Sequence, residues 1–152
     1  MRLWVDADAA PREMKDIIFR AGKRLGFETV LVANRSLAVP AAYRRVQSIA
    51  VSGGPDAADR YIAANARPGD VAVTADIALA AELVEKSVAV IDPRGEEYTI
   101  DNVRSRLSLR NFMEGLRGAG MITGGPPQYG PKEKQAFAAT LDRMLTRAQR
   151  KT

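Results

Sequence analysis

The chain has 152 residues, contains neither cysteine nor histidine, and carries a formal net charge of +5. A chain of this length most simply forms one domain and can bury about two-thirds of its unfolded surface. The missing residue types exclude disulfides, thiolate nucleophiles, the common zinc sites and histidine-based triads. Any metal site must therefore use oxygen ligands, which favour Mg²⁺ or Mn²⁺. The first residues do not resemble a signal peptide and no apolar run reaches membrane-spanning length, so we expect a cytoplasmic protein without a membrane partner.

The chain opens with a short apolar strand, Leu3 to Val5, which leads directly into Asp6 and Asp8. Small residues follow, and then Pro11, which suits the first turn of a helix. Ligands of open parallel sheets bind outside the carboxyl ends of the strands, where Asp6 is expected to lie. Neighbouring half-buried carboxylates usually require a cation or hydrogen-bond donors. The alternative is structural: Asp8 would help to cap the helix, and Asp6 would accept hydrogen bonds from a neighbouring turn.

Helix and strand patterns then alternate as far as residue 100. We expect helices over 12–25, 56–66 and 77–86, a short helix within 39–46, and strands over 29–33, 48–51, 71–74 and 88–91. Strands that are apolar on both faces and are separated by helices indicate a parallel sheet with both faces covered. The sequence thus predicts an α/β fold in three layers, with an open parallel sheet of about five strands.

Polar residues follow the four leading strands of this sheet. They are Asp6, Asn34, Ser52 and Asp76, and each stands at the carboxyl end of its strand. Together they form a rim of oxygen groups where an α/β fold places its ligand site. Asn34 is a candidate substrate contact on this rim.

Four further acidic positions can be sorted against this rim. Asp56 and Asp59 share one helix face, and Asp59 is the better metal ligand because Asp56 is well placed to be the N-cap. Asp76 could equally be only the N-cap of the following helix. Asp70 precedes its strand and Asp92 starts a turn, so we expect structural roles for both.

Positive charge is concentrated in the last third of the chain. Residues 1–100 carry 13 Lys or Arg and 14 Asp or Glu, whereas residues 101–152 carry 10 and 4. An α/β core over 1–100 with a basic helical segment over 101–152 packed on it suits an enzyme that acts on a polyanion. A solvated basic face without a partner is the alternative. The candidate contacts for a phosphate backbone are Arg104, Arg106, Arg110 and Arg117.

The basic segment is expected to contain three helices. A short one covers 101–107, and a second begins after Ser108, with Leu109, Phe112, Met113 and Leu116 on one face. Residues 118–131 are rich in Gly and Pro and are not expected to be helical; here the backbone of Gly124 and Gly125 could bind a phosphate, although an ordinary loop is the alternative. The last helix covers 132–150, with an inward face of Phe137, Leu141, Met144, Leu145 and Ala148.

Short motifs along most of the chain resemble those of the YaiI/YqxD family of bacterial proteins, which is usually grouped with the PIN-like nucleases. They are Trp4-Val5-Asp6-Ala7-Asp8 with Pro11 and Lys15, Val32-Ala33-Asn34, Gly54-Pro55-Asp56-Ala57-Ala58-Asp59, Gly69-Asp70, Thr74-Ala75-Asp76-Ile77-Ala78-Leu79-Ala80, Arg110-Asn111-Phe112-Met113 and Thr123-Gly124-Gly125-Pro126. The family often has cysteine at the position of Ala10, so a thiol is not essential here.

The resemblance implies a PIN-like fold and an acidic cluster that binds Mg²⁺ or Mn²⁺ to cleave RNA. Carried over by position, the catalytic carboxylates are Asp6, Asp8, Asp59 and Asp76. The metal ligands are Asp6, Asp59 and Asp76, with Asp56 as an outer member. Carboxylates that share a divalent ion can orient a water molecule and stabilise charge on a phosphodiester. Lys15 could contact a phosphate oxygen, although an exposed helix lysine is more often simply solvated.

Three hypotheses follow. The first is a metal-dependent nuclease acting on RNA, and the second is a non-catalytic RNA-binding module with a structural acidic rim. The third is a phosphatase of the haloacid dehalogenase kind, which also begins with a strand followed by Asp-x-Asp. Against the third, Ala9-Ala10-Pro11 follows Asp8, and Gly69-Asp70 precedes its strand, whereas that chemistry needs an acidic pair after one.

Overall fold

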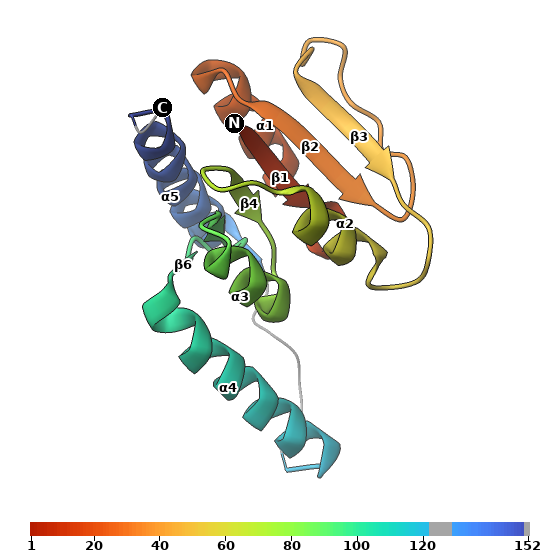
Figure 1. Cartoon of the computed structure of the whole chain (residues 1–152), viewed down its shortest axis with the longest axis vertical. Helices are drawn as coiled ribbons and strands as arrows, with labels where there is room; N and C mark the ends of the chain where they lie inside the picture. Colours follow the sequence, from red (N-terminus) through yellow and green to blue (C-terminus); the bar gives the residue numbers. More distant parts are fainter. Residues whose placement is uncertain (122–128, 151–152) are drawn as a thin grey trace.

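A computed structural model describes residues 1–121 and 129–150 of the chain, and within them a six-stranded sheet forms the centre of the fold (Figure 1). The strand order is β3-β2-β1-β4-β5-β6. Neighbouring strands are parallel from β3 to β5, and β6 is antiparallel to β5. The strands are β1 Arg2–Asp6, β2 Glu28–Ala33, β3 Val46–Ala50, β4 Val71–Val73, β5 Ala89–Ile91 and β6 Glu97–Tyr98. The predicted three-layer α/β fold is confirmed, and β6 adds an antiparallel edge strand that was not predicted.

Helices cover both faces of this sheet (Figure 1). On one face lie α1 (Met14–Leu25) and α5 (Pro131–Arg150); on the other lie α2 (Ala57–Asn65) and α3 (Ile77–Glu85). Helix α4 (Ile100–Gly118) packs against α3, and a single 3-10 turn, Ala7–Ala9, follows β1. In the described part of the chain no helix is both long and apolar enough to span a membrane.

The alternation of side chains along β1 decides on which face Asp6 lies. Leu3 and Val5 belong to the apolar cluster formed with α1 and α5, whereas Trp4 belongs to the cluster formed with α2 and α3. Because successive side chains of a strand point to opposite faces, Asp6 lies on the same face as Trp4. This face is the one on which the helices carrying Asp59 and Asp76 pack.

Helix α5 packs closely on the turn between β5 and β6. Gly95 has φ +91°, and a Cβ atom added there would lie 2.7 Å from the backbone carbon of Ala136. The Thr140 hydroxyl donates a hydrogen bond to the Gly95 carbonyl oxygen at 2.9 Å. As predicted, Phe137, Leu141, Met144 and Leu145 of this helix are buried, whereas Ala148, also expected on this face, is only partly buried.

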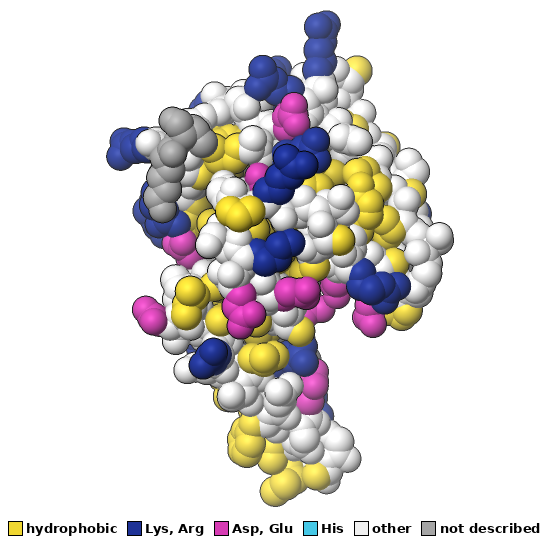
Figure 2. Space-filling view, viewed as in Figure 1, with side chains coloured by type: hydrophobic (Ala, Val, Ile, Leu, Met, Phe, Trp, Pro, Cys, Tyr) yellow, Lys and Arg dark blue, Asp and Glu magenta, His cyan; other side chains and the backbone are white. Residues whose placement is uncertain are grey.

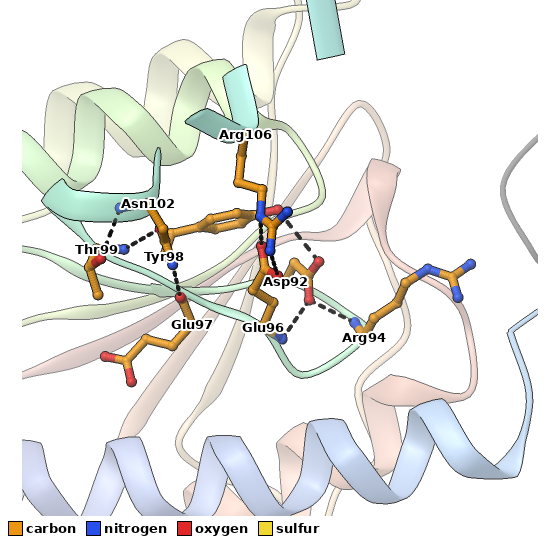
Figure 3. Close-up of polar contacts among 8 residues, drawn as sticks. All are labelled: Asp92, Arg94, Glu96, Glu97, Tyr98, Thr99, Asn102 and Arg106. Atoms are coloured by element: carbon orange, nitrogen blue, oxygen red, sulfur yellow. Dashed lines mark hydrogen bonds and ion pairs between the residues drawn. The ribbon is translucent and has the colours of Figure 1, made fainter. Parts of the chain in front are cut away.

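Polar contacts fix the start of α4 to the same turn (Figure 3). Thr99 caps the helix, since its hydroxyl accepts from the Asn102 backbone N–H while the Asn102 side chain accepts from the Thr99 N–H. Asp92 accepts hydrogen bonds from the backbone N–H groups of Arg94 and Glu96, in agreement with the structural role predicted for it.

The prediction of two helices within 101–117 is wrong, because Ile100–Gly118 is one continuous helix and Ser108 does not interrupt it. The predicted apolar face is also not buried: Leu109 is 51% exposed and Phe112 is 62% exposed. Helix α3, with nine residues, is less than half as long as the 19-residue α4, so among the described residues no helix covers the far end of α4. Figure 2 shows this apolar end projecting below the core.

The short helix expected within 39–46 is also wrong. Two successive turns replace it, closed by hydrogen bonds from the Tyr43 N–H to the Pro40 carbonyl and from the Val46 N–H to the Tyr43 carbonyl. Tyr43 packs on Phe19 of α1 with ring centroids 5.2 Å apart. Because β3 already starts at Val46 and Tyr43 is held against Phe19, the segment is too short to form a helix.

Candidate functional site

The candidate site is built around Asp6, the last residue of β1, which is only 2% exposed. Strand β4 pairs with β1, and the register that places Val5 beside Val73 brings Thr74 next to Asp6. The Thr74 hydroxyl donates a hydrogen bond of 3.0 Å to Oδ2 of Asp6. Sequence reasoning did not identify Thr74 as a site residue. Its position directly after a strand and two residues before Asp76 was the available signal.

Asp76 is the N-cap of α3, as one of the two interpretations of the sequence predicted. Its Oδ1 atom accepts hydrogen bonds from the N–H groups of Ala78 at 2.9 Å and Leu79 at 3.2 Å. The Asp76 N–H itself donates to the Thr74 hydroxyl at 3.0 Å. Thr74 therefore links Asp6 to Asp76 through a single oxygen atom.

Asp59, in the first turn of α2, completes a cluster with Asp6 and Asp76, which we call the aspartate triad. Burial raises the pKa of Asp59 to about 8, and a hydrogen bond of its protonated form with Asp76 and the negative charges of Asp6 and Asp76 add to this effect. The pKa of Asp6 is also raised, mainly by burial, although the Thr74 hydrogen bond opposes that shift. Asp59 thus interacts with both Asp6 and Asp76, and the pKa values of Asp6 and Asp59 are raised.

Asp8 and Asp56 lie at the border of the aspartate triad. Oδ2 of the exposed Asp8 accepts a hydrogen bond of 2.8 Å from the Asn34 N–H, and the Asp8 charge contributes to the raised pKa of Asp6. Asp56 occupies the N-cap position of α2 but its side chain makes no capping hydrogen bond, so the predicted side-chain cap is wrong. The exposed side chain of Asp56 instead lines the groove beside the triad.

This groove is open and has a volume of about 470 Å³, within the range of small-ligand sites. Asp56, Asp59 and Asp76 line it together with Arg60 and Glu82. The magenta band of acidic side chains above the projecting end of α4 in Figure 2 marks this region of the molecule. Asp6 is not among the lining residues, because it is buried.

The four arginines predicted to contact a phosphate backbone lie in different environments. Arg110 of α4 borders the triad, with its Nη1 atom 3.9 Å from Oδ1 of Asp76, as expected for at least one of the four arginines. Arg106 instead makes two hydrogen bonds of 2.8 Å with the Glu96 carboxylate (Figure 3). Arg104 and Arg117 are exposed on α4.

The remaining predicted contacts are Lys15, Gly124 and Gly125. Lys15 belongs to α1, which packs on the opposite face of the sheet from α2 and α3, and no ion pair joins it to an acidic residue in the described ranges. Gly124 and Gly125 lie outside the described residues.

The donor set of the triad suits a hard divalent cation, because carboxylate oxygens are the ligands that Mg²⁺ and Mn²⁺ prefer. Within 1–121 and 129–150, however, no group of three acidic side chains is already arranged around a metal position. Asp59 instead interacts with both Asp6 and Asp76, and its pKa is raised. A cation would have to displace that proton, so metal binding would depend on pH.

Comparisons with known proteins agree over nearly the whole chain. The family described as "Uncharacterized BCR, YaiI/YqxD family" matches residues 4–147. A "UPF0178 protein" of Myxococcus xanthus is 56% identical over 148 residues, covering 97% of this chain and 95% of the relative. Similar proteins of the same name occur in Syntrophobacter fumaroxidans, at 53% identity over 97% of this chain and 95% of the relative, and in Trichlorobacter lovleyi, at 51% over 99% and 97%. No solved structure gives a significant match.

Proposed function

This chain belongs to the YaiI/YqxD family, and we propose that it is a metal-dependent nuclease that hydrolyses phosphodiester bonds in RNA. The observation that carries the proposal is the aspartate triad. Asp6, Asp59 and Asp76 come from three separate elements and meet at the carboxyl end of a parallel sheet. These three residues lie in the motifs that resemble the YaiI/YqxD family, which is usually grouped with the PIN-like nucleases. That resemblance supports the same reaction class.

The energetics of the triad also favour a ligand-binding role. Burial and like charges raise the pKa values of Asp6 and Asp59, and a fold gains no stability from such an arrangement. Groups with strongly raised pKa values beside a groove are typical of functional sites. A bound Mg²⁺ or Mn²⁺ would supply the positive charge that stabilises a phosphodiester during hydrolysis.

Each residue of the site has a definable task in this proposal. Asp6, Asp59 and Asp76 would hold the cation, with Asp56 in an outer position and Asp8 beside Asp6. Thr74 orients Asp6, because its hydroxyl donates to Oδ2 of that carboxylate. The N-terminus of α3 fixes Asp76 through the Ala78 and Leu79 N–H groups.

Arg110 is the candidate contact for the RNA phosphate nearest this cluster. Its guanidinium group lies beside Asp76, and its buried Nε atom has no hydrogen-bond acceptor within the described residues. The two ion pairs of Arg110, with Asp76 at 3.9 Å and Glu114 at 3.8 Å, are long, so the guanidinium retains hydrogen-bonding capacity for a phosphate.

A non-catalytic RNA-binding module is the second candidate, and two observations favour it. Asp76 already has a structural task as the N-cap of α3, and the described carboxylates do not surround a metal position.

The phosphatase hypothesis is weaker, because its chemistry needs an acidic pair after a strand and Asp70 precedes β4. Asp70 is buried at the amino end of β4, where its carboxylate accepts from the Arg2 N–H and the Trp4 indole at 3.0 Å each.

The deciding experiment incubates the purified protein with mixed single-stranded RNA and with DNA, in Mn²⁺, in Mg²⁺ and in a chelator. We expect cleavage of RNA in the presence of a divalent ion, and its loss in Asp6→Asn. Asp16→Asn, which changes an exposed carboxylate on α1, is the matched control and should cleave like wild type. RNA binding without cleavage under every metal condition would instead establish the binding module.

A further inference from the structure

A second cavity lies at the opposite end of the sheet from the aspartate triad. It has a volume of about 620 Å³ and is enclosed by the end of α1, the start of β2 and residues 42–46 before β3. The triad stands at the carboxyl ends of the strands, whereas Thr29 and Val46, which line this cavity, stand at amino ends. The volume lies within the range of small-molecule sites. We call this space the amino-end cavity.

Aromatic side chains form part of its wall. Phe19 and Phe27 are buried, and Tyr43 is partly buried with its ring 5.2 Å from that of Phe19, at an interplanar angle of 42°. The Lys23 ammonium lies 5.7 Å from the centroid of the Tyr43 ring. The cavity therefore presents flat apolar surface directly beside a positive charge.

The charged groups lining the amino-end cavity all have one sign. Four of the lining residues are basic and none is acidic: Lys23, Arg24, Arg44 and Arg45. Arg24 forms an ion pair with Asp142, and Arg45 donates a hydrogen bond of 2.8 Å to the Gly26 carbonyl. Arg44 is exposed and has no ion pair within the described ranges, so it and Lys23 are available to an anion.

A buried hydroxyl at this cavity also lacks a partner. Thr29 is 1% exposed, lines the cavity, and its Oγ1 atom has no hydrogen bond within the described residues. The Oγ1 atom is itself buried against Gly22, where an added Cβ atom would stand 2.7 Å away, so Thr29 is part of the cavity wall and its hydroxyl does not face a ligand.

We propose that the amino-end cavity binds a nucleoside phosphate. The base would pack on the aromatic wall, and the phosphate would contact Arg44 and Lys23. Arginine pairs with phosphate through parallel hydrogen bonds, and aromatic side chains stack on nucleobases of any sequence. This proposal does not depend on the nuclease activity, because no residue of the aspartate triad takes part in it.

The test titrates the four ribonucleoside 5′-monophosphates into the whole chain, followed by calorimetry and backbone amide NMR. Matched titrations use inorganic phosphate and the corresponding nucleosides. At least one nucleotide should bind tenfold more tightly than phosphate or its nucleoside, and should shift the amide signals of residues 19–29 and 42–46. Binding equal to that of phosphate alone, or no binding, would overturn the proposal.

Four variants identify the site of binding. Arg44→Ala should weaken nucleotide binding at least tenfold, and Arg110→Ala, at the aspartate triad, should leave it unchanged. Asp6→Asn should likewise bind the nucleotide normally even where it has lost RNA cleavage. Thr29→Val removes the unsatisfied buried hydroxyl, so it should raise the melting temperature, and because it leaves Arg44 and Lys23 in place it should leave nucleotide binding unchanged. Loss of binding in Arg110→Ala but not in Arg44→Ala would assign the nucleotide to the aspartate triad and overturn the proposal.

Discussion

The Thr74 hydroxyl and the Asp6 carboxylate are joined by a hydrogen bond of 3.0 Å at the adjoining ends of β4 and β1. The same hydroxyl accepts a hydrogen bond from the Asp76 N–H. Because that N–H occupies a lone pair of the oxygen, the hydroxyl proton is directed toward Asp6. Thr74 therefore favours the ionised form of the Asp6 carboxylate and opposes the rise in its pKa that burial causes.

Thr74→Val should accordingly raise the pKa of Asp6 further and destabilise the fold by about 1–3 kcal/mol, the usual cost of a lost hydrogen bond to a charged group. It should also weaken Mn²⁺ binding, because Asp6 must be ionised to act as a ligand. Urea unfolding and Mn²⁺ titration measure the two effects.

Thr140→Val is the matched control, since it removes a buried hydroxyl that donates to the Gly95 carbonyl far from any carboxylate. It should lose stability and keep its metal affinity. Equal Mn²⁺ affinity in both variants would mean that Thr74 has only a structural role.

The pH dependence of stability should report the raised pKa of Asp59. Between the ordinary aspartate value of 3.8 and about 8, the folded chain retains a proton on Asp59 that the unfolded chain has released. The folded state binds more protons in this window, so this residue's contribution to stability falls as pH rises through it and is constant above about 8. Asp59→Asn cannot lose such a proton, and it should melt several degrees above wild type at pH 8–9, at about 2–4 °C per kcal/mol.

The melting temperatures of Asp59→Asn and wild type are measured from pH 5 to 9. The difference between them is used, because the contributions of groups that titrate in both proteins then cancel. Asp16→Asn, an exposed carboxylate, should follow the wild-type curve. A constant difference between Asp59→Asn and wild type over this range would show that Asp59 titrates normally.

The sequence allowed the sheet and the aspartate triad to be predicted, because both depend on local pattern. Apolar runs of three or four residues identified β1 to β5, and the rule that α/β ligand sites lie at carboxyl strand ends brought Asp6 and Asp76 together. Asp59 could be added because its helix follows the Gly53-Gly54-Pro55 turn at that edge.

Features that depend on packing between distant elements could not be predicted. The pairing of Arg106 with Glu96 and of Arg110 with Asp76 depends on how α4 packs, which charge counting does not reveal. The apolar pattern of Leu109 and Phe112 predicted burial, yet no local signal indicates that α3 is too short to cover them. Likewise, the basic and aromatic residues of the amino-end cavity are scattered over residues 19–46, and only the fold brings them together.

Mn²⁺ should raise the melting temperature of the wild type and not that of Asp6→Asn, because a cation that binds only the folded triad stabilises it by mass action. The shift should increase from pH 6 to pH 8, since the metal must displace the Asp59 proton. Thermal shift assays over a Mn²⁺ series measure this without any substrate. Equal shifts in the two proteins would place the bound metal elsewhere.

Arg110 and Arg106 should behave differently although both belong to α4. Arg110→Ala should weaken RNA binding and reduce the slope of log K against log salt by about 0.7, the value for one phosphate contact of a single strand. Arg106→Ala should leave the slope unchanged and cost up to about 1 kcal/mol of stability, because it removes a surface ion pair with Glu96. Identical salt slopes for the two variants would remove Arg110 from the RNA contact.

The projecting end of α4 makes a final prediction possible, through two phenylalanines in different environments. Phe112 is 62% exposed, whereas Phe137 is completely buried between α5 and the sheet. Phe137→Ala should destabilise the fold by about 3–5 kcal/mol, because it leaves a cavity in the core. Phe112→Ala should change the free energy of unfolding by no more than about 0.5 kcal/mol, as is usual for a surface position. Urea unfolding at two protein concentrations, tenfold apart, checks both values. A loss above 2 kcal/mol for Phe112→Ala that grows with protein concentration would show that a second copy of the chain covers this end of α4.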